Sequence, residues 1–375
     1  MVISPVSLVL LLLPIAAASG WLAGRKTVPA KLSKRESKLH SAYFVGLNYL
    51  LNEEPDKALD VFLKLVKVDT ETIETHLALG SLFRRKGEVD RATRIHQNIV
   101  TRNLDPKLRV KALFELAQDY LSAGVLDRAE RLFLELVEMG QNTAVNLKHL
   151  LHIYQQEKDW PQAIQIAQRL QRIAKISMNA VTAQHYCELT EKMRHQNQLS
   201  QAYHYLKLAQ SIDPNCVRSS LIRGELAMAA ENYEEAIRAF QLVEKQDPSY
   251  LTEIIVPLRH CYKAMNNEAG LVERLEYYLS RYPRMSFIVA LAKYRQHQIS
   301  EEGKIQEVVE YIQKALIQPL THVHMSYRCG QCSYSWQRLY WLCPSCHTWN
   351  SVKPMEALEH ALFGKNKEKI PVLTL

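Results

Sequence analysis

The chain has 375 residues, with 47 Lys and Arg against 39 Asp and Glu, so its formal net charge is +8. A hydrophobic fraction of 47% excludes wholesale disorder, and seven cysteines are too few for a disulfide-stapled secreted domain. The basic excess lies in residues 25–40 and 320–375, which leaves residues 41–319 neutral. Because the large middle region carries no basic excess, we predict no nucleic-acid partner.

The first segment, residues 1–24, carries no charged side chain. A helix from Val2 to Gly24 would be roughly 34 Å long, enough to cross a hydrocarbon core of about 30 Å. A cleaved signal peptide, ending at Ala16 to Ala18, is the alternative, but it needs basic residues before its apolar run. Here the basic residues follow, at 25–40, which keeps the rest of the chain in the cytoplasm. We predict a transmembrane anchor at 1–24 and a basic juxtamembrane segment at 25–40, which is a topology signal or also contacts anionic headgroups.

Small residues recur at a spacing of 34 in the middle of the chain. An alanine series runs through it, with small and aromatic residues at fixed offsets before it, and Phe62, Phe133 and Phe240 four residues after three of its members. The series is Ala58, Ala92, Ala129, Ala163, Ala202 and Ala236. This pattern resembles the tetratricopeptide repeat, a helix–turn–helix unit of 34 residues. We predict an all-α solenoid over 41–319, with six clear units from about 39 to 249 and two degenerate ones after them.

A solenoid of this kind is a scaffold whose concave face binds partner segments. If the first helix of each unit lines that face, a set of polar residues becomes a candidate partner-binding groove. Ordinary solvated helix faces are the alternative for each of them. The set is Arg84, Arg85, Gln118, His152, Gln155, Glu191, Arg194 and Glu225.

Four cysteines near the C-terminus have the spacing of a metal site. Two C-x2-C turns, separated by ten residues, contain Cys329, Cys332, Cys343 and Cys346. Facing turns of this type hold one tetrahedral ion with four thiolates, and zinc and iron both suit such a site. A redox dithiol pair or incidental cysteines are the alternatives. We predict a metal-binding domain at 320–354, folded by its ion, and a C-terminal helix and tail at 355–375.

The remaining candidate residues have structural interpretations. Cys187, Cys216 and Cys261 are expected on repeat helices as small buried apolar side chains. Tyr340, Trp341 and Trp349 are expected to pack the small domain, also against the last repeats. The chain lacks a phosphate-binding G-x-x-x-x-G-K, an H-E-x-x-H and a G-x-S-x-G, and the four-cysteine site has no open ligand position. We therefore predict that the protein is not an enzyme.

The order of anchor, basic juncture, repeat array and terminal cysteine turns is similar to that of the lipopolysaccharide assembly protein B (LapB/YciM) family of Gram-negative bacteria. The most specific stretch runs from Tyr327 to Pro354 and includes Leu339-Tyr340-Trp341 and Cys343-Pro344-Ser345-Cys346. The resemblance implies a single-pass inner-membrane protein with its bulk in the cytoplasm and a rubredoxin-like metal domain docked on the repeats.

The resemblance also implies an adaptor role in lipopolysaccharide biosynthesis. Such an adaptor modulates proteolysis of LpxC, the deacetylase that commits lipid A synthesis, by the membrane protease FtsH, and gathers lipopolysaccharide synthesis and assembly proteins at the membrane. Whether it forms a homo-oligomer stays open. Two departures from rubredoxin weaken the alternative of a membrane-tethered electron carrier. Ser333 and His347 stand where rubredoxins usually have Gly, and the ten-residue gap is short.

Overall fold

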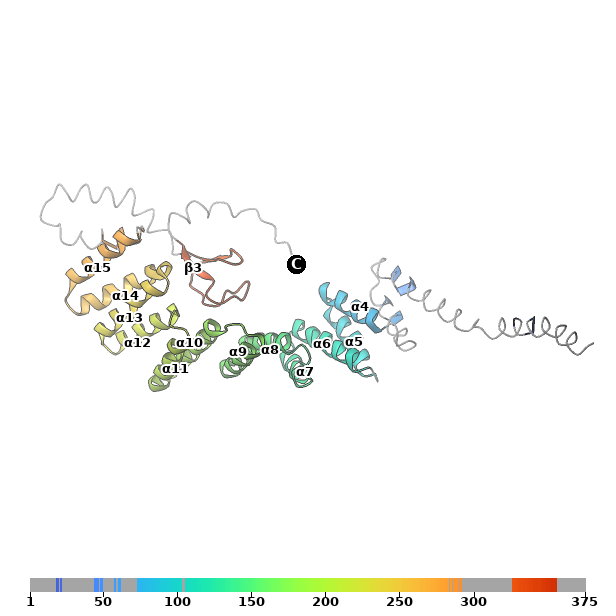
Figure 1. The fold of residues 1–375 in the computed structure, drawn as a ribbon. Helices are drawn as coiled ribbons and strands as arrows, with labels where there is room; N and C mark the ends of the chain where they lie inside the picture. The colour runs from blue at the N-terminus through green and yellow to red at the C-terminus, as the bar shows by residue number, and fades with distance from the viewer. Residues whose placement is uncertain are drawn as a thin grey trace, which may run out of the picture. The chain divides into compact units, whose positions relative to one another are not determined.

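The computed structural model describes residues 73–102, 105–282 and 326–355, together with scattered residues in 18–61 and 284–291. The chain divides into two compact units, residues 1–153 and 154–375, and each is described by itself (Figure 1). The predicted anchor, the basic segment 25–40 and the tail after Met355 lie outside the described residues, apart from a few isolated positions near residue 20. In the described part of the chain, no helix is both long enough and apolar enough to cross a membrane.

The first unit contains antiparallel helix pairs joined by short turns. Helices α4 and α5 pack together, and α6 packs on α7. Asp105 caps α6 by accepting a hydrogen bond from the Lys107 N–H, and Pro106 occupies the first turn, where no N–H is needed. The helices are α4 (Ile73–Arg85), α5 (Val89–Val100), α6 (Pro106–Ser122), α7 (Leu126–Glu138) and the start of α8 (Thr143–Glu157).

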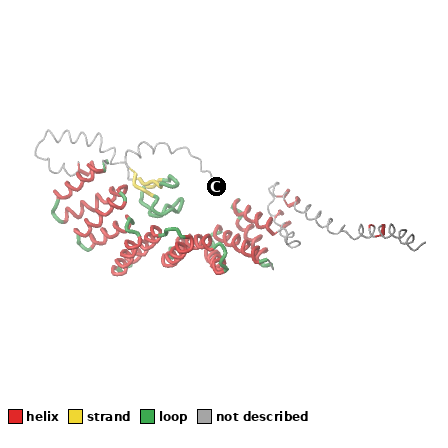
Figure 2. The backbone as a smooth tube through the Cα atoms, in the orientation of Figure 1, coloured by secondary structure: helices red, strands yellow, loops and turns green. Residues whose placement is uncertain are grey.

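The second unit continues the helical pairs and ends in a small sheet. Figure 2 shows its helices in red, joined by short loops, and its strands in yellow. The pair α14–α15 extends the pairing beyond residue 249, into the region where degenerate repeats were predicted. Its elements are α9 (Trp160–Ala174), α10 (Asn179–His195), α11 (Leu199–Ile212), α12 (Val217–Ala229), α13 (Tyr233–Gln246), η1 (Pro248–Tyr250), α14 (Leu251–Ala264) and α15 (Glu268–Arg281).

The repeat period coincides with the core of the solenoid. All six members of the alanine series, from Ala58 to Ala236, are completely buried. Two glycines allow helices to approach closely: a Cβ on Gly80 would lie 2.3 Å from His96 Nε2, and one on Gly224 would lie 2.3 Å from Phe240 Cε1. Small residues therefore recur because the two helices of one repeat have no room for a larger side chain between them.

The C-terminal sheet has three antiparallel strands in the order β2-β1-β3. They are β1 (Ser326–Cys329), β2 (Ser335–Trp336) and β3 (Val352–Met355). In the register, Cys329 pairs with Val352 and Tyr327 pairs with Trp336. The described part of the chain is thus a helical solenoid with a small β domain that carries the cysteine turns, as predicted.

Candidate metal centre and its seat on the repeats

The four predicted cysteines come together at one point of the small domain. Their Sγ atoms all lie within 4.8 Å of one another. Cys329 Sγ is 3.6 Å from Cys346 Sγ, and Cys332 Sγ is 3.7 Å from Cys343 Sγ. A tetrahedral ion with Zn–S bonds of about 2.3 Å requires sulfur separations of about 3.8 Å. All four thiols are free. The site therefore fits one metal ion held by four cysteines.

Two tight turns aim the thiols at this point. The residues after the second cysteine of each pair, Ser333 and His347, have φ angles of 59° and 53°. Their N–H groups donate to the carbonyl oxygens of Cys329 and Cys343, 2.9 Å away in both cases. The departures from Gly at these positions thus leave the left-handed turn in place, at a cost in backbone strain that Gly avoids.

Neighbouring polar groups favour the thiolate form that a metal requires at Cys329 and Cys346, whereas burial raises the pKa of the Cys343 thiol. Burial opposes ionisation of Cys329, but N–H groups of Cys332 and Gln331 and the Ser351 hydroxyl, 3.2 Å from Sγ, lower the pKa of its thiol to about 6. Likewise, the Thr348 hydroxyl lies 3.4 Å from Cys346 Sγ and lowers the pKa of that thiol. Because all four ligand positions come from protein sulfur, the site would hold its ion without an open position for substrate.

The metal domain is seated on the helices of the second unit. Trp349 packs edge-on against two rings, Trp160 of α9 at a centroid distance of 6.3 Å and His185 of α10 at 5.6 Å. Beside them, the Gln184 amide donates to Asn350 Oδ1 over 2.8 Å. The domain therefore contacts the middle of the array, in addition to the last repeats that the sequence suggested.

A second set of contacts reaches α12, η1 and α14. Tyr250 stacks on Trp341 at a centroid distance of 5.4 Å and donates its hydroxyl hydrogen to the carbonyl oxygen of Val352 over 2.9 Å. The guanidinium of Arg218 lies 5.9 Å from the Trp341 ring centroid. Tyr327 donates to the Glu253 carboxylate over 3.0 Å. Trp341 and Trp349 are thus docking residues, while Tyr340 lies beside Trp336 and is 37% exposed.

The charges of this interface are few and mostly suppressed. Burial raises the pKa of Glu253, and burial lowers the pKa of His185 from 6.5 to about 4. Asp247 is the exception: burial opposes its ionisation, but its ion pair with Lys353 and contacts with Ser249 lower its pKa. The seat of the metal domain is therefore an aromatic surface with one ion pair across the interface, Lys353 with Asp247, and the Arg218 guanidinium, paired with Glu188, against the Trp341 ring.

One short segment, residues 348–353, serves both the metal and the interface. Thr348 and Ser351 lie beside the ligand sulfurs, as described above. Between and after them, Trp349, Asn350 and Lys353 contact the repeats. Because neighbouring residues of one segment contact the ligand sulfurs and the repeats, a change of this segment on metal loss would also change its contacts with the repeats.

The predicted groove residues all lie on even-numbered helices, from α4 to α12. Within each unit, the structure brings some of them together in pairs. Arg84 donates to Gln118 over 2.8 Å, Arg194 pairs with both Glu191 and Glu225 at 2.6 Å, and Gln155 contacts His185 at 3.0 Å. Arg85 is exposed and His152 is half-buried. Their role in partner binding stays a prediction.

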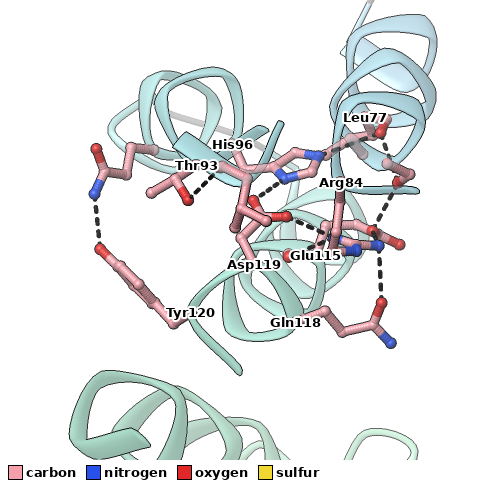
Figure 3. A network of polar contacts seen from close by, with 11 residues as sticks. Leu77, Arg84, Thr93, His96, Glu115, Gln118, Asp119 and Tyr120 are labelled. Atoms are coloured by element: carbon pink, nitrogen blue, oxygen red, sulfur yellow. Dashed lines mark hydrogen bonds and ion pairs between the residues drawn. The ribbon is translucent and has the colours of Figure 1, made fainter. Parts of the chain in front are cut away.

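Arg84 belongs to a buried ionic network that joins α4, α5 and α6 (Figure 3). It donates to Asp119 over 2.7 Å and to Glu115 over 2.6 Å. On its other side, Asp119 meets His96 Nδ1 at 2.5 Å, and His96 Nε2 lies 3.2 Å from the Leu77 carbonyl oxygen. His96 and Asp119 are completely buried. This network fixes the relative positions of three helices in the first unit.

The three remaining cysteines are buried, as predicted. Cys187 and Cys261 lie within α10 and α14, but Cys216 is not on a helix. It precedes α12 as its cap residue, because the helix begins only at Val217. The docking residues Gln184, His185 and Tyr250 were missed altogether. Nothing in their residue types marks them as docking residues, since their role depends on a domain more than 70 residues away along the chain.

Known proteins resemble this chain over its whole length and in its parts. A family model described as the rubredoxin metal binding domain matches residues 327–354, and two tetratricopeptide repeat models match 75–109 and 196–250. The crystal structure of MamA protein aligns at 21% identity with a TM-score of 0.33, covering 49% of this chain and 96% of that one.

The curated relatives match far more of the chain. Lipopolysaccharide assembly protein B of Escherichia coli K12 is 33% identical over 94% of this chain and 99% of the relative. The protein of the same name from Haemophilus influenzae is 34% identical over 95% of this chain and 100% of the relative. Identity at this level along nearly both full lengths shows that the chain belongs to the family of lipopolysaccharide assembly protein B.

Proposed function

We propose that this protein is a membrane-tethered adaptor that regulates lipopolysaccharide biosynthesis. It would control the amount of the committing deacetylase LpxC through proteolysis by the membrane protease FtsH, and gather assembly proteins at the inner membrane. The observation that carries the proposal is the full-length similarity to relatives named for lipopolysaccharide assembly. The uncharged segment 1–24 and the basic segment 25–40 support the membrane tether.

The described architecture is suited to binding and not to turnover. Repeats present long helix faces to partners, and a four-cysteine site without an open position holds a fold together. A tether raises the effective concentration of partners that share the membrane. An adaptor can therefore change the rate at which a protease degrades its substrate without any catalytic group of its own.

The test is to deplete the protein in cells and to follow the level of the deacetylase. We expect the level to rise in cells with active FtsH and to stay unchanged where the protease is already inactive. Re-expression of the wild-type chain should lower the level again. An unchanged level after depletion in protease-competent cells would contradict the proposal.

The contribution of the metal domain is tested in the same cells. The Cys329→Ser/Cys332→Ser variant should fail to restore the deacetylase level, whereas Cys261→Ser, which removes a buried thiol outside the site, should restore it. Metal analysis of the purified protein separates this role from electron transfer. Colourless, zinc-loaded protein that restores the level would exclude an electron carrier, since zinc has no accessible redox change.

A further inference from the structure

One position of the repeat recurs at the seat of the metal domain. It lies 18 residues before the repeat alanine: Gln184 before Ala202, and Arg218 before Ala236. Gln184 donates to Asn350, and Arg218 lies against the Trp341 ring. In the second unit, residues at this position therefore contact the metal domain.

The same position in the first unit faces an open pocket. Counting 18 residues back from Ala92 and Ala129 gives Glu74 and Lys111. Both line a pocket of about 360 Å³, together with Leu77 and Ala78 of α4, Val110 and Phe114 of α6, and three polar residues. Their side chains form a 2.8 Å ion pair and are 68% and 59% exposed. Side chains at this repeat position contact the metal domain in the second unit and are solvent-accessible in the first.

The pocket is preformed, because buried contacts fix its walls. Glu115, which lines it, accepts hydrogen bonds from Ser81 over 2.7 Å and from Arg84 over 2.6 Å. Figure 3 shows Arg84 and Glu115 joined by dashed lines between α4 and α6. The Phe114 ring is held by edge contacts with Phe133 and His149 at centroid distances of 6.1 and 5.8 Å. A site whose walls are already ordered loses little freedom when it binds.

We propose that the pocket between α4 and α6 binds an extended segment of a partner protein through one large apolar side chain, with a flanking polar or charged residue meeting Glu74 and Lys111. The model for this occupant is the chain's own segment in the second unit, where Trp349 packs edge-on against the stacked rings of Trp160 and His185, and Asn350 pairs with Gln184. Leu77, Val110 and Phe114 supply the apolar walls, and the exposed ion pair can exchange its internal contact for charges of the occupant. The inference deepens the proposed adaptor function and rests on it for the identity of the partner.

The test uses a variant that fills the pocket without disturbing the core. Ala78 is exposed on α4, so Ala78→Trp places a ring in the pocket, and Ala264→Trp is the matched control at the exposed end of α14. A random dodecapeptide phage library is selected on the full-length protein in detergent, and the enriched peptides are synthesised with a fluorophore. Fluorescence polarisation then gives their dissociation constants for each variant.

We expect the enriched peptides to share a large apolar residue beside a polar or charged one. Ala78→Trp should weaken their binding by about tenfold or more, the effect of losing one buried apolar side chain, and Ala264→Trp should leave it unchanged. Lys111→Glu, on a side chain outside the core, should raise the share of basic flanking residues among the enriched peptides. Peptides that bind equally to Ala78→Trp, or a library without enrichment, would overturn the proposal.

The cellular experiment separates this inference from the proposed function. Ala78→Trp should fail to restore the deacetylase level in depleted cells, with the protein present at the wild-type amount. Full restoration by Ala78→Trp would sink the pocket as the partner site and leave the adaptor function intact. If depletion itself leaves the deacetylase unchanged, the adaptor function fails, and the peptide measurements alone decide whether the pocket binds segments of this chemistry.

Discussion

The two compact units use one repeat position in different ways. In the second unit, Gln184 and Arg218 are covered by the metal domain of the same chain. In the first, Glu74 and Lys111 remain exposed beside a pocket. The comparison teaches that the repeat period determines the core but leaves the even-numbered helix faces free to differ. The repeat position that the metal domain covers in the second unit is therefore exposed in the first.

The helix contacts inside the two units differ as well. Gly224 packs against the apolar ring of Phe240, whereas Gly80 packs against His96, which stands at the same position of its repeat. The first unit thus replaces an aromatic contact by a buried ionic network of His96, Asp119 and Arg84. An apolar contact only fills space, but a network of charges holds its helices in one arrangement only while every member is present.

Metal removal should have the largest effect on local stability. It would uncover the helix face beneath the metal domain, so that this face becomes exposed as it is in the first unit. The small domain has a core of only a few buried residues, among them Tyr327 and Val352, and structural zinc contributes about 10–16 kcal/mol to such folds. We expect a chelator, or Cys329→Ser/Cys332→Ser, to unfold residues 326–355 and to expose the surface around Gln184 and Tyr250. Hydrogen exchange of β1, β3 and α10, with a red shift of tryptophan emission, measures this. Cys261→Ser is the control, and unchanged protection of β3 would contradict the expectation.

Removal of the Asp119 carboxylate should cause the next largest loss of stability, in the first unit. Asp119→Ala leaves His96 and Arg84 without their common partner in a buried site, which costs about 3–5 kcal/mol when an ionic network is broken. We expect faster hydrogen exchange in α4, α5 and α6, with α12 and α13 unchanged.

The double variant His96→Phe/Asp119→Ile tests whether an apolar contact can replace the ionic one. It introduces the residue types found at the corresponding positions of the next repeat, Phe133 and Ile153, both completely buried. Apolar replacement of a buried ionic group is often neutral or stabilising. Recovery of most of the lost protection is expected, and a double variant as unstable as Asp119→Ala would show that the contacts of neighbouring repeats are not interchangeable.

Acid should weaken the seat of the metal domain through His185 of α10. Burial depresses the pKa of His185 from 6.5 to about 4, so the unfolded chain binds this proton more readily than the folded one. Stability is complete above about pH 6.5 and falls as the pH drops toward 4, by at most about 3 kcal/mol. His185 Nδ1 has no hydrogen-bond partner, so no acceptor stabilises a proton on that nitrogen.

The measurement is the hydrogen exchange of α10 and β3 between pH 7 and 4, corrected for intrinsic exchange rates. His185→Phe keeps a ring between Trp160 and Trp349 and cannot be protonated. We expect it to remove most of the pH dependence of α10 in this range. A pH dependence identical to that of the wild-type protein would exclude His185 as its source.

The sequence predicted what depends on local spacing. The alanine series located the helix pairs because its members must be small wherever two helices touch, and the C-x2-C turns located the ligands because two residues per turn face one ion. It could not predict where the metal domain is seated. That surface combines Trp349 with Trp160 and His185. Trp349 lies more than 160 residues after either of them in the sequence, and no repeat period relates it to them. The Asp119 network escaped prediction for the same reason, since a buried carboxylate is recognised only from the partners around it.

The smallest effect should come from closing the space at the two glycines. Gly224→Ala would press a methyl group on the Phe240 ring, and Gly80→Ala would press one on His96. Overpacking costs about 1–3 kcal/mol, partly offset by the helix propensity gained with Ala, about 1 kcal/mol. We expect the larger loss for Gly80→Ala, because a displaced His96 also leaves Asp119 short of a partner.

Thermal unfolding followed by hydrogen exchange in each unit distinguishes the two cases. Phe240→Leu removes ring atoms from the contact, so it should rescue Gly224→Ala in the double variant. His96→Leu should not rescue Gly80→Ala, since it makes room for the methyl group but abandons the buried carboxylate. Equal rescue in both units would mean that the His96 contact is space filling, as at Phe240, and that the ionic network adds little to the packing of α4 on α5.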